Sequence, residues 1–284
     1  MTYLNKIHHC NQVDFSAYSP FYIDNQRYGH MPKSFVKHLQ QWSDIFQIST
    51  DKVQLNPELS TYQQRSEALA TVLDHLHQTG VIDTWVGELY PVNHAYGEKG
   101  VMQIERAAAL YFGVRCYGVH MNGLVRKSDG TYVWVAVRAK DKPFFSGRLD
   151  QMVAGGQPVG IGLMDNLIKE CQEEANIPAE LASQAQARGY INYQMETQRG
   201  IETSTLFNFD CWLPEDFVPE NTDGEVDSFE LVPIQAMAEL TENTSRFKDN
   251  CDLCNIDLLI RAGIITEQHA DYQEITRLLY QDSK

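Results

Sequence analysis

The sequence has little of what defines several whole classes of protein. It contains 6 cysteines among 284 residues, too few and too scattered for a secreted domain held together by disulfides. No uninterrupted apolar run approaches the roughly 18–20 residues that a membrane helix needs. The first residues, MTYLNKIHHCNQ, lack the apolar centre of a secretory signal. We therefore expect a soluble, cytoplasmic protein with no membrane partner.

Basic residues are also scarce, because 23 Lys and Arg stand against 38 Asp and Glu, a net charge of −15. General binding to nucleic acid requires a basic surface, so we expect no nucleic-acid partner. The hydrophobic content of 43%, with 18 Gly and 10 Pro, is ordinary for a globular chain. The length suits one large domain or two ordinary ones.

The first part of the chain combines helical and strand patterns. Apolar residues recur at helical intervals over residues 32–48 and 63–80. Residues 82–92 are typical of a strand that leads into a turn, and residues 104–113 of a short helix. We predict that residues 1–112 form an α+β N-terminal region.

The pattern changes to strands at about residue 113. A hairpin is predicted within 114–140, a helix at about 163–175, and two further strands at 189–196 and 202–213, before C-terminal helices. The order strand, strand, loop, helix, strand, strand packs one helix against a mixed sheet. The fold class is therefore α/β, and we predict that residues 113–284 form one domain that includes the C-terminal helices.

A single CxxC, formed by Cys251 and Cys254, is the one cysteine motif. No second CxxC or spaced His pair accompanies it, so a zinc or redox site is the weaker interpretation. The surrounding CDLCNIDLLI favours a helix whose apolar residues face the core.

The predicted helix at 163–175 carries a costly arrangement of charge. Glu170, Glu173 and Glu174 share one face at i, i+3 and i+4, away from the apolar stripe. Like charges at these spacings repel by a few tenths of a kcal/mol per pair, and they lie in the final turns, where the macrodipole disfavours anions. A solvated surface would explain an ordinary acidic face. On this face, a bound cation would offset the repulsion between the three carboxylates, and such oxygen ligands suit Mg²⁺ or Mn²⁺.

The same segment resembles the signature of the Nudix hydrolases: Gly, five residues, Glu, seven residues, then Arg-Glu-apolar-x-Glu-Glu-x-Gly-apolar. Gly155 opens the match and residues 169–177, KECQEEANI, close it. The glutamates of the metal-binding face all match. Three positions differ, with Ile161 in place of the first Glu, Lys169 in place of Arg, and Asn176 in place of Gly.

The resemblance implies a Nudix α/β/α sandwich with a mixed sheet, and a Mg²⁺-dependent hydrolase of diphosphates. It implies metal ligands at Glu170, Glu173 and Glu174 and at the Gly155 carbonyl, with Glu173 and Glu174 catalytic. Glu225, in a DGEV turn, is an alternative general base.

The flanks of the signature resemble the thiamine-pyrophosphokinase-related subgroup of Nudix proteins. They include WVAVRAKDKPFFSGRLDQMVAGGQP before the helix, and GELYPV in the N-terminal region. The resemblance implies hydrolysis of thiamine diphosphate, or of its oxidised forms, to the monophosphate and phosphate.

Substrate contacts are expected from two regions. Between residues 115 and 148 there are seven basic residues and two acidic ones, and we predict that Arg138 and Lys142 contact the phosphates. Aromatic side chains of the N-terminal region, Trp85 and Tyr90 foremost, are predicted to wall the organic moiety.

Three other functions stay open at this stage. The first is a Nudix hydrolase of another nucleoside-diphosphate-type substrate, the second an isomerase of the same fold, and the third a non-catalytic diphosphate-binding regulator. The organic half of the substrate, the general base and the role of the N-terminal region are not determined by the sequence, which also allows a homodimer.

Overall fold

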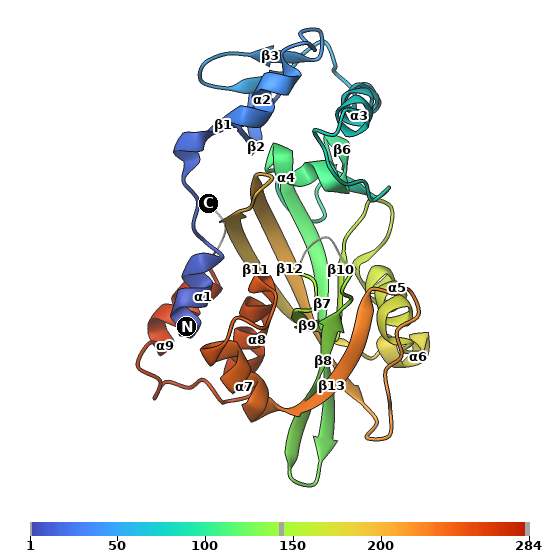
Figure 1. Cartoon of the computed structure of the whole chain (residues 1–284), viewed down its shortest axis with the longest axis vertical. Coiled ribbons are helices and arrows are strands. Elements are labelled where there is room, and N and C mark those ends of the chain that lie inside the picture. The colour runs from blue at the N-terminus through green and yellow to red at the C-terminus, as the bar shows by residue number, and fades with distance from the viewer. Residues whose placement is uncertain (1, 142–144, 282–284) are drawn as a thin grey trace.

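A small N-terminal sheet stands at one end of a larger mixed sheet that forms the centre of the molecule (Figure 1). The computed structural model describes residues 2–141 and 145–281. Within these residues, none of the helices is long and apolar enough to cross a membrane.

The N-terminal part is built from short elements, as its α+β pattern predicts. Its four-stranded sheet has the order β2-β1-β4-β3, and β5 pairs separately with β6. The elements are α1 (Tyr3–His9), the 3₁₀ turn η1 (Phe15–Ala17), β1 (Tyr18–Ile23), β2 (Gln26–Pro32), α2 (Lys33–Leu39), β3 (Phe46–Ile48), β4 (Val53–Leu55), α3 (Tyr62–Gln78), β5 (Leu89–Val92), β6 (Met102–Glu105), the 3₁₀ turn η2 (Arg106–Ala108) and α4 (Ala109–Phe112).

Two predictions for this part need correction. The helix expected over 32–48 ends at Leu39, because the chain turns and Phe46 then pairs with Leu55 in an antiparallel hairpin. Both residues are buried there, so strand pairing decides the conformation over helical spacing. The strand expected over 82–92 is confined to β5. The helix predicted over 63–80 is confirmed by α3, which a capping box at Thr61 initiates.

The central sheet has the order β11-β12-β7-β8-β13, with β10 paired to β7 and β9 to β8. Its β12 and β7 strands run parallel and the others antiparallel, which confirms the predicted mixed sheet. The elements are β7 (Arg115–Lys127), β8 (Gly130–Arg138), β9 (Leu149–Gln151), β10 (Val153–Gly156), α5 (Leu163–Ala175), α6 (Ala179–Ala182), β11 (Gln186–Glu196), β12 (Ile201–Leu213), β13 (Val226–Pro233), α7 (Ile234–Asn243), α8 (Asp249–Arg261) and α9 (Tyr272–Leu279).

Helices cover both faces of this sheet, as a sandwich requires (Figure 1). On one face, Leu167 and Cys171 of α5 pack in a buried cluster with Val119 of β7. On the other, α7 and α8 form a cluster with β11 and β12, which includes Ile256 and Leu206. The α/β/α arrangement predicted from the sequence is confirmed.

Helix α5 has the bounds that its apolar periodicity predicts. It ends at Ala175 and is capped by Asn176, whose φ of 51° and ψ of 35° are left-handed. Asparagine tolerates this conformation better than most residues, which explains how it can replace the Gly of the signature.

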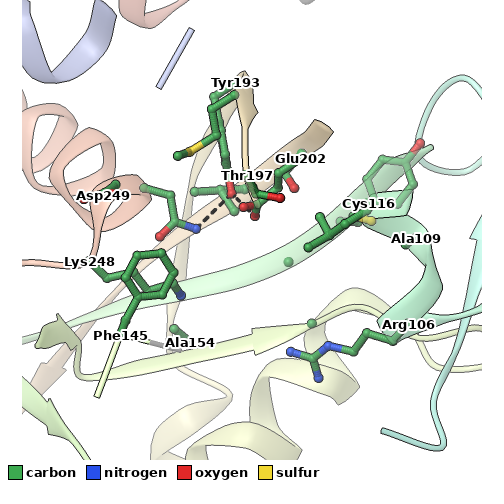
Figure 2. A pocket seen from close by; sticks show the side chains of 18 of the residues that line it. Arg106, Ala109, Cys116, Phe145, Ala154, Tyr193, Thr197, Glu202, Lys248 and Asp249 are labelled. Atoms are coloured by element: carbon green, nitrogen blue, oxygen red, sulfur yellow. Dashed lines mark hydrogen bonds between the residues drawn. The ribbon is translucent and has the colours of Figure 1, made fainter. Parts of the chain in front are cut away.

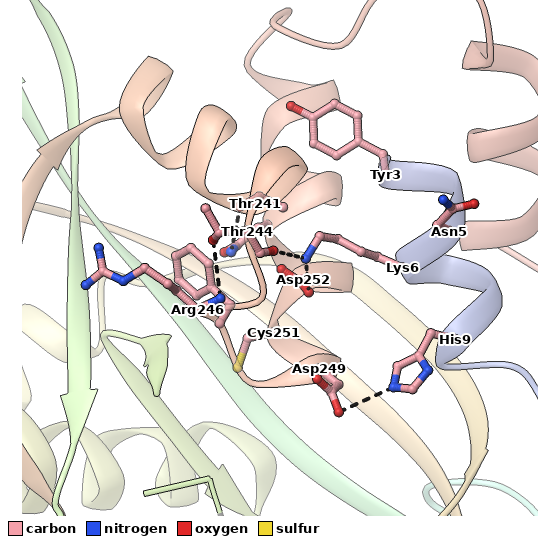
Figure 3. A network of polar contacts seen from close by, with 12 residues as sticks. Tyr3, Asn5, Lys6, His9, Thr241, Thr244, Arg246, Asp249, Cys251 and Asp252 are labelled. Carbon is pink, nitrogen blue, oxygen red and sulfur yellow. Dashed lines mark hydrogen bonds and ion pairs between the residues drawn. The ribbon is translucent and has the colours of Figure 1, made fainter. Parts of the chain in front are cut away.

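The chain's first helix is not packed within the N-terminal part. Helix α1 lies against α8 and α9 at the opposite end of the sequence (Figure 3). Nζ of Lys6 lies 2.7 Å from Oδ2 of Asp252 in a buried ion pair, and it also donates to the Thr244 carbonyl over 2.7 Å. The division of the chain at residue 112 stays a prediction, and α1 belongs spatially with the C-terminal helices.

Candidate metal centre and substrate cavity

Strand β10 lies so close to α5 that no side chain would fit at the position of Gly155. A Cβ built on Gly155 would lie 2.3 Å from Cδ and 2.5 Å from Cγ of Glu170. Asn166 of α5 donates from Nδ2 to the Gly156 carbonyl over 2.8 Å. The Ala154 N–H donates to Oε2 of Glu174 over 2.8 Å. The helix that carries the glutamates is therefore fixed to the edge of β10.

The glutamates of α5 lie in different environments. Glu174 is buried. Burial raises its pKa well above the usual value, and the negative charges of Asp150, Glu170 and Glu225 add to this rise. The hydrogen bond from the Ala154 N–H acts in the opposite direction and lowers the pKa.

The Glu170 side chain is 12% exposed. Burial raises its pKa, and Lys169, with Nζ 3.3 Å from Oε1, opposes the rise. Glu173 is 43% exposed and pairs with Lys169 over 2.6 Å. Glu170 and Glu174 thus face β10, while Glu173 is turned toward Lys169 and solvent.

A further carboxylate from a distant part of the sequence joins this group. Glu225, directly before β13, lines a small cavity together with Glu174, Asp150 and Arg138. The position that the sequence offers as an alternative base is therefore brought beside the buried glutamate of α5. A concentration of carboxylates with one member buried is the electrostatic setting in which a divalent cation is stabilising.

The direction of the backbone in β10 selects the carbonyl on the side of the glutamates. Gln157 donates its N–H to the Tyr117 carbonyl on β7 over 2.9 Å, and hydrogen-bonded positions alternate along an antiparallel ladder. The Gly155 carbonyl, two residues back, therefore points toward β7. The N–H and the carbonyl of Ala154 point to the opposite side, away from β7, as the hydrogen bond from the Ala154 N–H to Glu174 confirms. The sequence predicts the Gly155 carbonyl as a ligand, whereas the geometry favours that of Ala154.

Beside β10, a cavity of about 960 Å³ opens between the end of the N-terminal part and the central sheet. Its lining includes Tyr90 and Arg106 from the N-terminal part, and Ala154, Gly155 and Gly156 from β10. A Cβ on Gly156 would lie 1.6 Å from Oη of Tyr90, so the tyrosine hydroxyl lies directly over the glycine.

Of the residues predicted to bind substrate, two line the cavity and one of the others does not. Tyr90 and Arg138 line the cavity, and Nη1 of Arg138 lies 2.9 Å from Oδ2 of Asp150. Trp85 is 39% exposed, stacks on His77 with ring centroids 4.9 Å apart, and is not among the described residues that line the cavity. Lys142 lies outside the described residues.

Sequence reasoning missed several residues of the cavity wall. Arg106 reaches it from η2, with its guanidinium 5.7 Å from the Tyr90 ring centroid. Lys248, at the start of α8, and Tyr193 and Glu202, on neighbouring strands, complete the wall (Figure 2). No motif in the sequence marks them, since only the fold brings these four segments together.

A buried polar cluster lies beneath the cavity. Ligand atoms of His120, Asp150 and Cys251 lie within 4.8 Å of one another, and Sγ of Cys251 lies 2.8 Å from Oδ1 of Asp150. Although burial acts to raise it, the nearby charges of Lys248, His120 and Arg138 lower the pKa of Asp150 to about 2. Because Arg138, at 2.9 Å, and Lys248, at 3.6 Å, already offset the charge of Asp150, the cluster does not require a metal ion. As predicted, the CxxC lies on a helix, α8, with both cysteines buried.

Comparison with known proteins places these features in a family. Residues 2–116 match a family described as a domain of unknown function, DUF4743. The chain is 40% identical to Nudix hydrolase 24, chloroplastic, of Arabidopsis thaliana over 281 residues, which cover 98% of this chain and 77% of that protein. It is 38% identical to Nudix hydrolase 20, chloroplastic, of the same plant over 288 residues, which cover 98% and 77% of the two chains.

Among solved structures, the Nudix domain of Shewanella oneidensis NrtR complexed with ADP ribose is similar at a TM-score of 0.41, with 12% identity, over 56% of this chain and 99% of that one. The MutT protein from Methanosarcina mazei Go1 is similar at a TM-score of 0.40 and 15% identity, over 52% and 95%. By its identity to the Arabidopsis hydrolases over almost its full length, this chain belongs to the Nudix hydrolase family and is an enzyme of that family.

Proposed function

We propose that this Nudix hydrolase is a Mg²⁺-dependent diphosphatase that converts thiamine diphosphate, or its oxidised forms, to the monophosphate and phosphate. The observation that carries the proposal is the cavity, which is lined by β10 and Glu225 at one side and extends to Tyr193 of β11 and Glu202 of β12. Glu174 of α5 adjoins its β10 side, where it accepts a hydrogen bond from the Ala154 N–H. Such a cavity suits a ligand with a diphosphate at one end and an organic cation at the other.

Glu170 and Glu174, with the Ala154 carbonyl, are the groups that would hold Mg²⁺ or Mn²⁺. The buried carboxylate of Glu174, surrounded by like charges, fits this role because a cation would offset its unfavourable burial. Bound there, the ion would neutralise diphosphate charge and polarise the attacking water.

The cationic side chains of the cavity wall supply the phosphate contacts in this proposal. Arg106 and Arg138 present planar guanidinium groups that suit phosphate oxygens, and Lys248 acts as a point charge. Arg138 is held from behind by Asp150 at 2.9 Å, which fixes its direction.

Glu173 and Glu225 are the two candidates for the general base. Glu173 is turned out toward Lys169, over 2.6 Å, so it would have to leave that ion pair to take a proton from water. Glu225 lines both the main cavity and the small cavity beside Glu174. This position favours Glu225 as the base, with Glu174 as a metal ligand.

A substrate screen tests the proposal. Phosphate release by the full chain with Mg²⁺ should be fastest for thiamine diphosphate or one of its oxidised forms, compared with ADP-ribose and nucleoside diphosphates. A clear preference for a nucleotide would replace the proposed substrate. Tight binding of these diphosphates without phosphate release would identify a regulator instead.

A further inference from the structure

Two polar side chains of the N-terminal part converge on the glycine that ends β10. A Cβ built on Gly156 would lie 1.6 Å from Oη of Tyr90 and 3.2 Å from Cζ of Arg106. The hydroxyl and the guanidinium are therefore no farther apart than the sum of these two distances. Both residues line the main cavity, and Figure 2 shows the Arg106 side chain extending toward it from the N-terminal part.

The Tyr90 hydroxyl is a donor without a partner in the described part of the chain. Tyr90 is 4% exposed, and its Oη makes no hydrogen bond to a described residue. Because Oη is not one of the fully enclosed unpaired atoms either, it opens onto the cavity. Burial raises the pKa of Tyr90 well above its usual value, against the nearby charge of Arg106, so the hydroxyl stays protonated and donates. Such a donor is satisfied by an acceptor on a bound ligand.

The Arg106 guanidinium is oriented from one end. Its Nη1 lies 2.8 Å from Oε2 of Glu88, and the Arg106 side chain is 42% exposed. A guanidinium has five N–H groups in a fixed planar arrangement. The ion pair with Glu88 therefore sets the direction of the group and leaves N–H donors for a ligand in the cavity.

A buried carboxylate fixes the backbone on both sides of these two residues. Val159, in the loop after β10, donates its N–H to the Leu89 carbonyl over 2.8 Å, which ties β5 to that loop next to Tyr90. Glu105, 3% exposed, precedes Arg106 in the chain. Its Oε1 accepts hydrogen bonds from three backbone N–H groups, those of Val86 (3.0 Å), Gly87 (3.2 Å) and Ala107 (3.3 Å).

The two donors lie close to the proposed metal ligands, across the same short strand. Gly155, whose added Cβ would meet Glu170, directly precedes Gly156, and successive Cα atoms are about 3.8 Å apart. After burial, the charge of Glu170 adds to the rise in the pKa of Tyr90, which agrees with this proximity. The sequence predicts Tyr90 in the wall around the organic moiety, whereas the position of its hydroxyl beside β10 favours a phosphate contact.

We infer that the Tyr90 hydroxyl and the Arg106 guanidinium bind oxygens of one phosphate group of the substrate, and that Tyr90 is a catalytic residue that stabilises the charge developed during hydrolysis. As water adds to one phosphorus, its bond to the bridging oxygen breaks and the electron pair stays on that oxygen. The water proton passes to the general base, and Tyr90 keeps its own. The inference rests on the proposed diphosphatase reaction but not on the identity of the organic group.

The test is Tyr90→Phe in the full chain, assayed by phosphate release from thiamine diphosphate. The substitution removes the hydroxyl and keeps the ring that lies 5.7 Å from the Arg106 guanidinium. We expect kcat to fall at least tenfold, since one preorganised donor to developing charge contributes about 100-fold or more. The KM should stay within about threefold, because the contact strengthens in the transition state. The melting temperature and the Mg²⁺ concentration for half-maximal rate should stay level.

A matched control removes a hydroxyl elsewhere in the N-terminal part. Oη of Tyr62 donates to Oε1 of Gln103 over 3.0 Å, and Tyr62 is not among the described residues that line the cavity. Tyr62→Phe should leave kcat unchanged. A folded Tyr90→Phe whose kcat falls less than tenfold, or an equal fall in Tyr62→Phe, would overturn the inference. A fall accompanied by a higher Mg²⁺ requirement would place the effect at the metal site and would overturn it as well.

A second pair of variants supplies the test if Tyr90→Phe does not fold. Arg106→Gln removes the other group of the site and should lower kcat/KM at least tenfold. Its control is Arg126→Gln, because the Arg126 guanidinium lies over the Trp212 ring and is not part of the described cavity lining. A smaller fall in Arg106→Gln, or the same fall in Arg126→Gln, contradicts the phosphate site.

Failure of the proposed function would be recognised separately. If the wild type hydrolyses ADP-ribose or a nucleoside diphosphate in place of thiamine diphosphate, the same variants are compared on that substrate. If it hydrolyses none of them, calorimetric titration with methylenediphosphonate, in which a CH₂ group replaces the bridging oxygen, decides. Binding that weakens at least tenfold in Arg106→Gln supports the phosphate site without the reaction. A smaller change, or no binding by the wild type, overturns it.

Discussion

Replacing Gly155 with alanine would insert a methyl group between β10 and the helix that carries the glutamates. The new Cβ would lie 2.3 Å from Cδ of Glu170, whereas carbon atoms in contact stay about 3.5 Å apart. The Glu170 carboxylate would have to move by about 1 Å, and a misplacement of that size can reduce turnover about 100-fold. Overpacking would also cost about 1–3 kcal/mol of stability.

The assay is Mg²⁺-dependent phosphate release by Gly155→Ala, with the fold checked by circular dichroism. We expect kcat/KM to fall about 100-fold, which corresponds to about 2.7 kcal/mol, and the Mg²⁺ concentration for half-maximal rate to rise. The control is Gly162→Ala, whose Cβ would meet Oδ2 of Asp165 at 3.1 Å and its Cγ at 3.9 Å, both at the end of an exposed side chain that can turn away. A folded Gly155→Ala with a rate close to that of Gly162→Ala would refute the reasoning.

Two further predictions concern stability. Burial lowers the pKa of His120 from 6.5 to about 4, so the stability that depends on its neutral form is present above pH 6.5 and is lost as the pH falls from 6.5 toward 4. Urea unfolding of His120→Asn at pH 7 and pH 4.5 should therefore show a pH dependence smaller than that of the wild type by about 3 kcal/mol, and an unchanged dependence would exclude His120 as its source. Lys6→Met should destabilise the fold by about 3–5 kcal/mol because it leaves the Asp252 carboxylate buried without its partner. The double variant Lys6→Met, Asp252→Leu should recover much of that loss in thermal unfolding, and a further loss would contradict a charge-based cause.

The sequence predicts those features of the fold that depend on residues close together in the chain. The bounds of α5 follow from its apolar spacing, and the grouping of Glu170 and Glu174 follows from helical geometry alone. The burial of Glu174 could not be read in this way, because it depends on Ala154 at the edge of β10, a contact between segments 20 residues apart.

The cavity wall was the least predictable part of the site. Arg106 and Glu202 come from elements that no short motif connects, and the parallel pairing of β12 with β7 brings Glu202 near the end of the N-terminal part. The helix expected over 32–48 was wrong for a related reason, since pairing of Phe46 with Leu55 outweighs local periodicity. The cytoplasmic location and the division at residue 112 stay predictions.

The central claim is that the buried carboxylate of α5 holds the metal ion of a diphosphatase. It is tested most directly by Glu174→Gln, in which the amide oxygen can still accept from the Ala154 N–H while the charge is removed. We predict that Mg²⁺-dependent kcat falls by more than tenfold, at least about 1.4 kcal/mol in the barrier. The melting temperature without metal should stay level or rise, because a buried charge among like charges is removed. A folded Glu174→Gln that retains more than about a tenth of the wild-type kcat would contradict the claim.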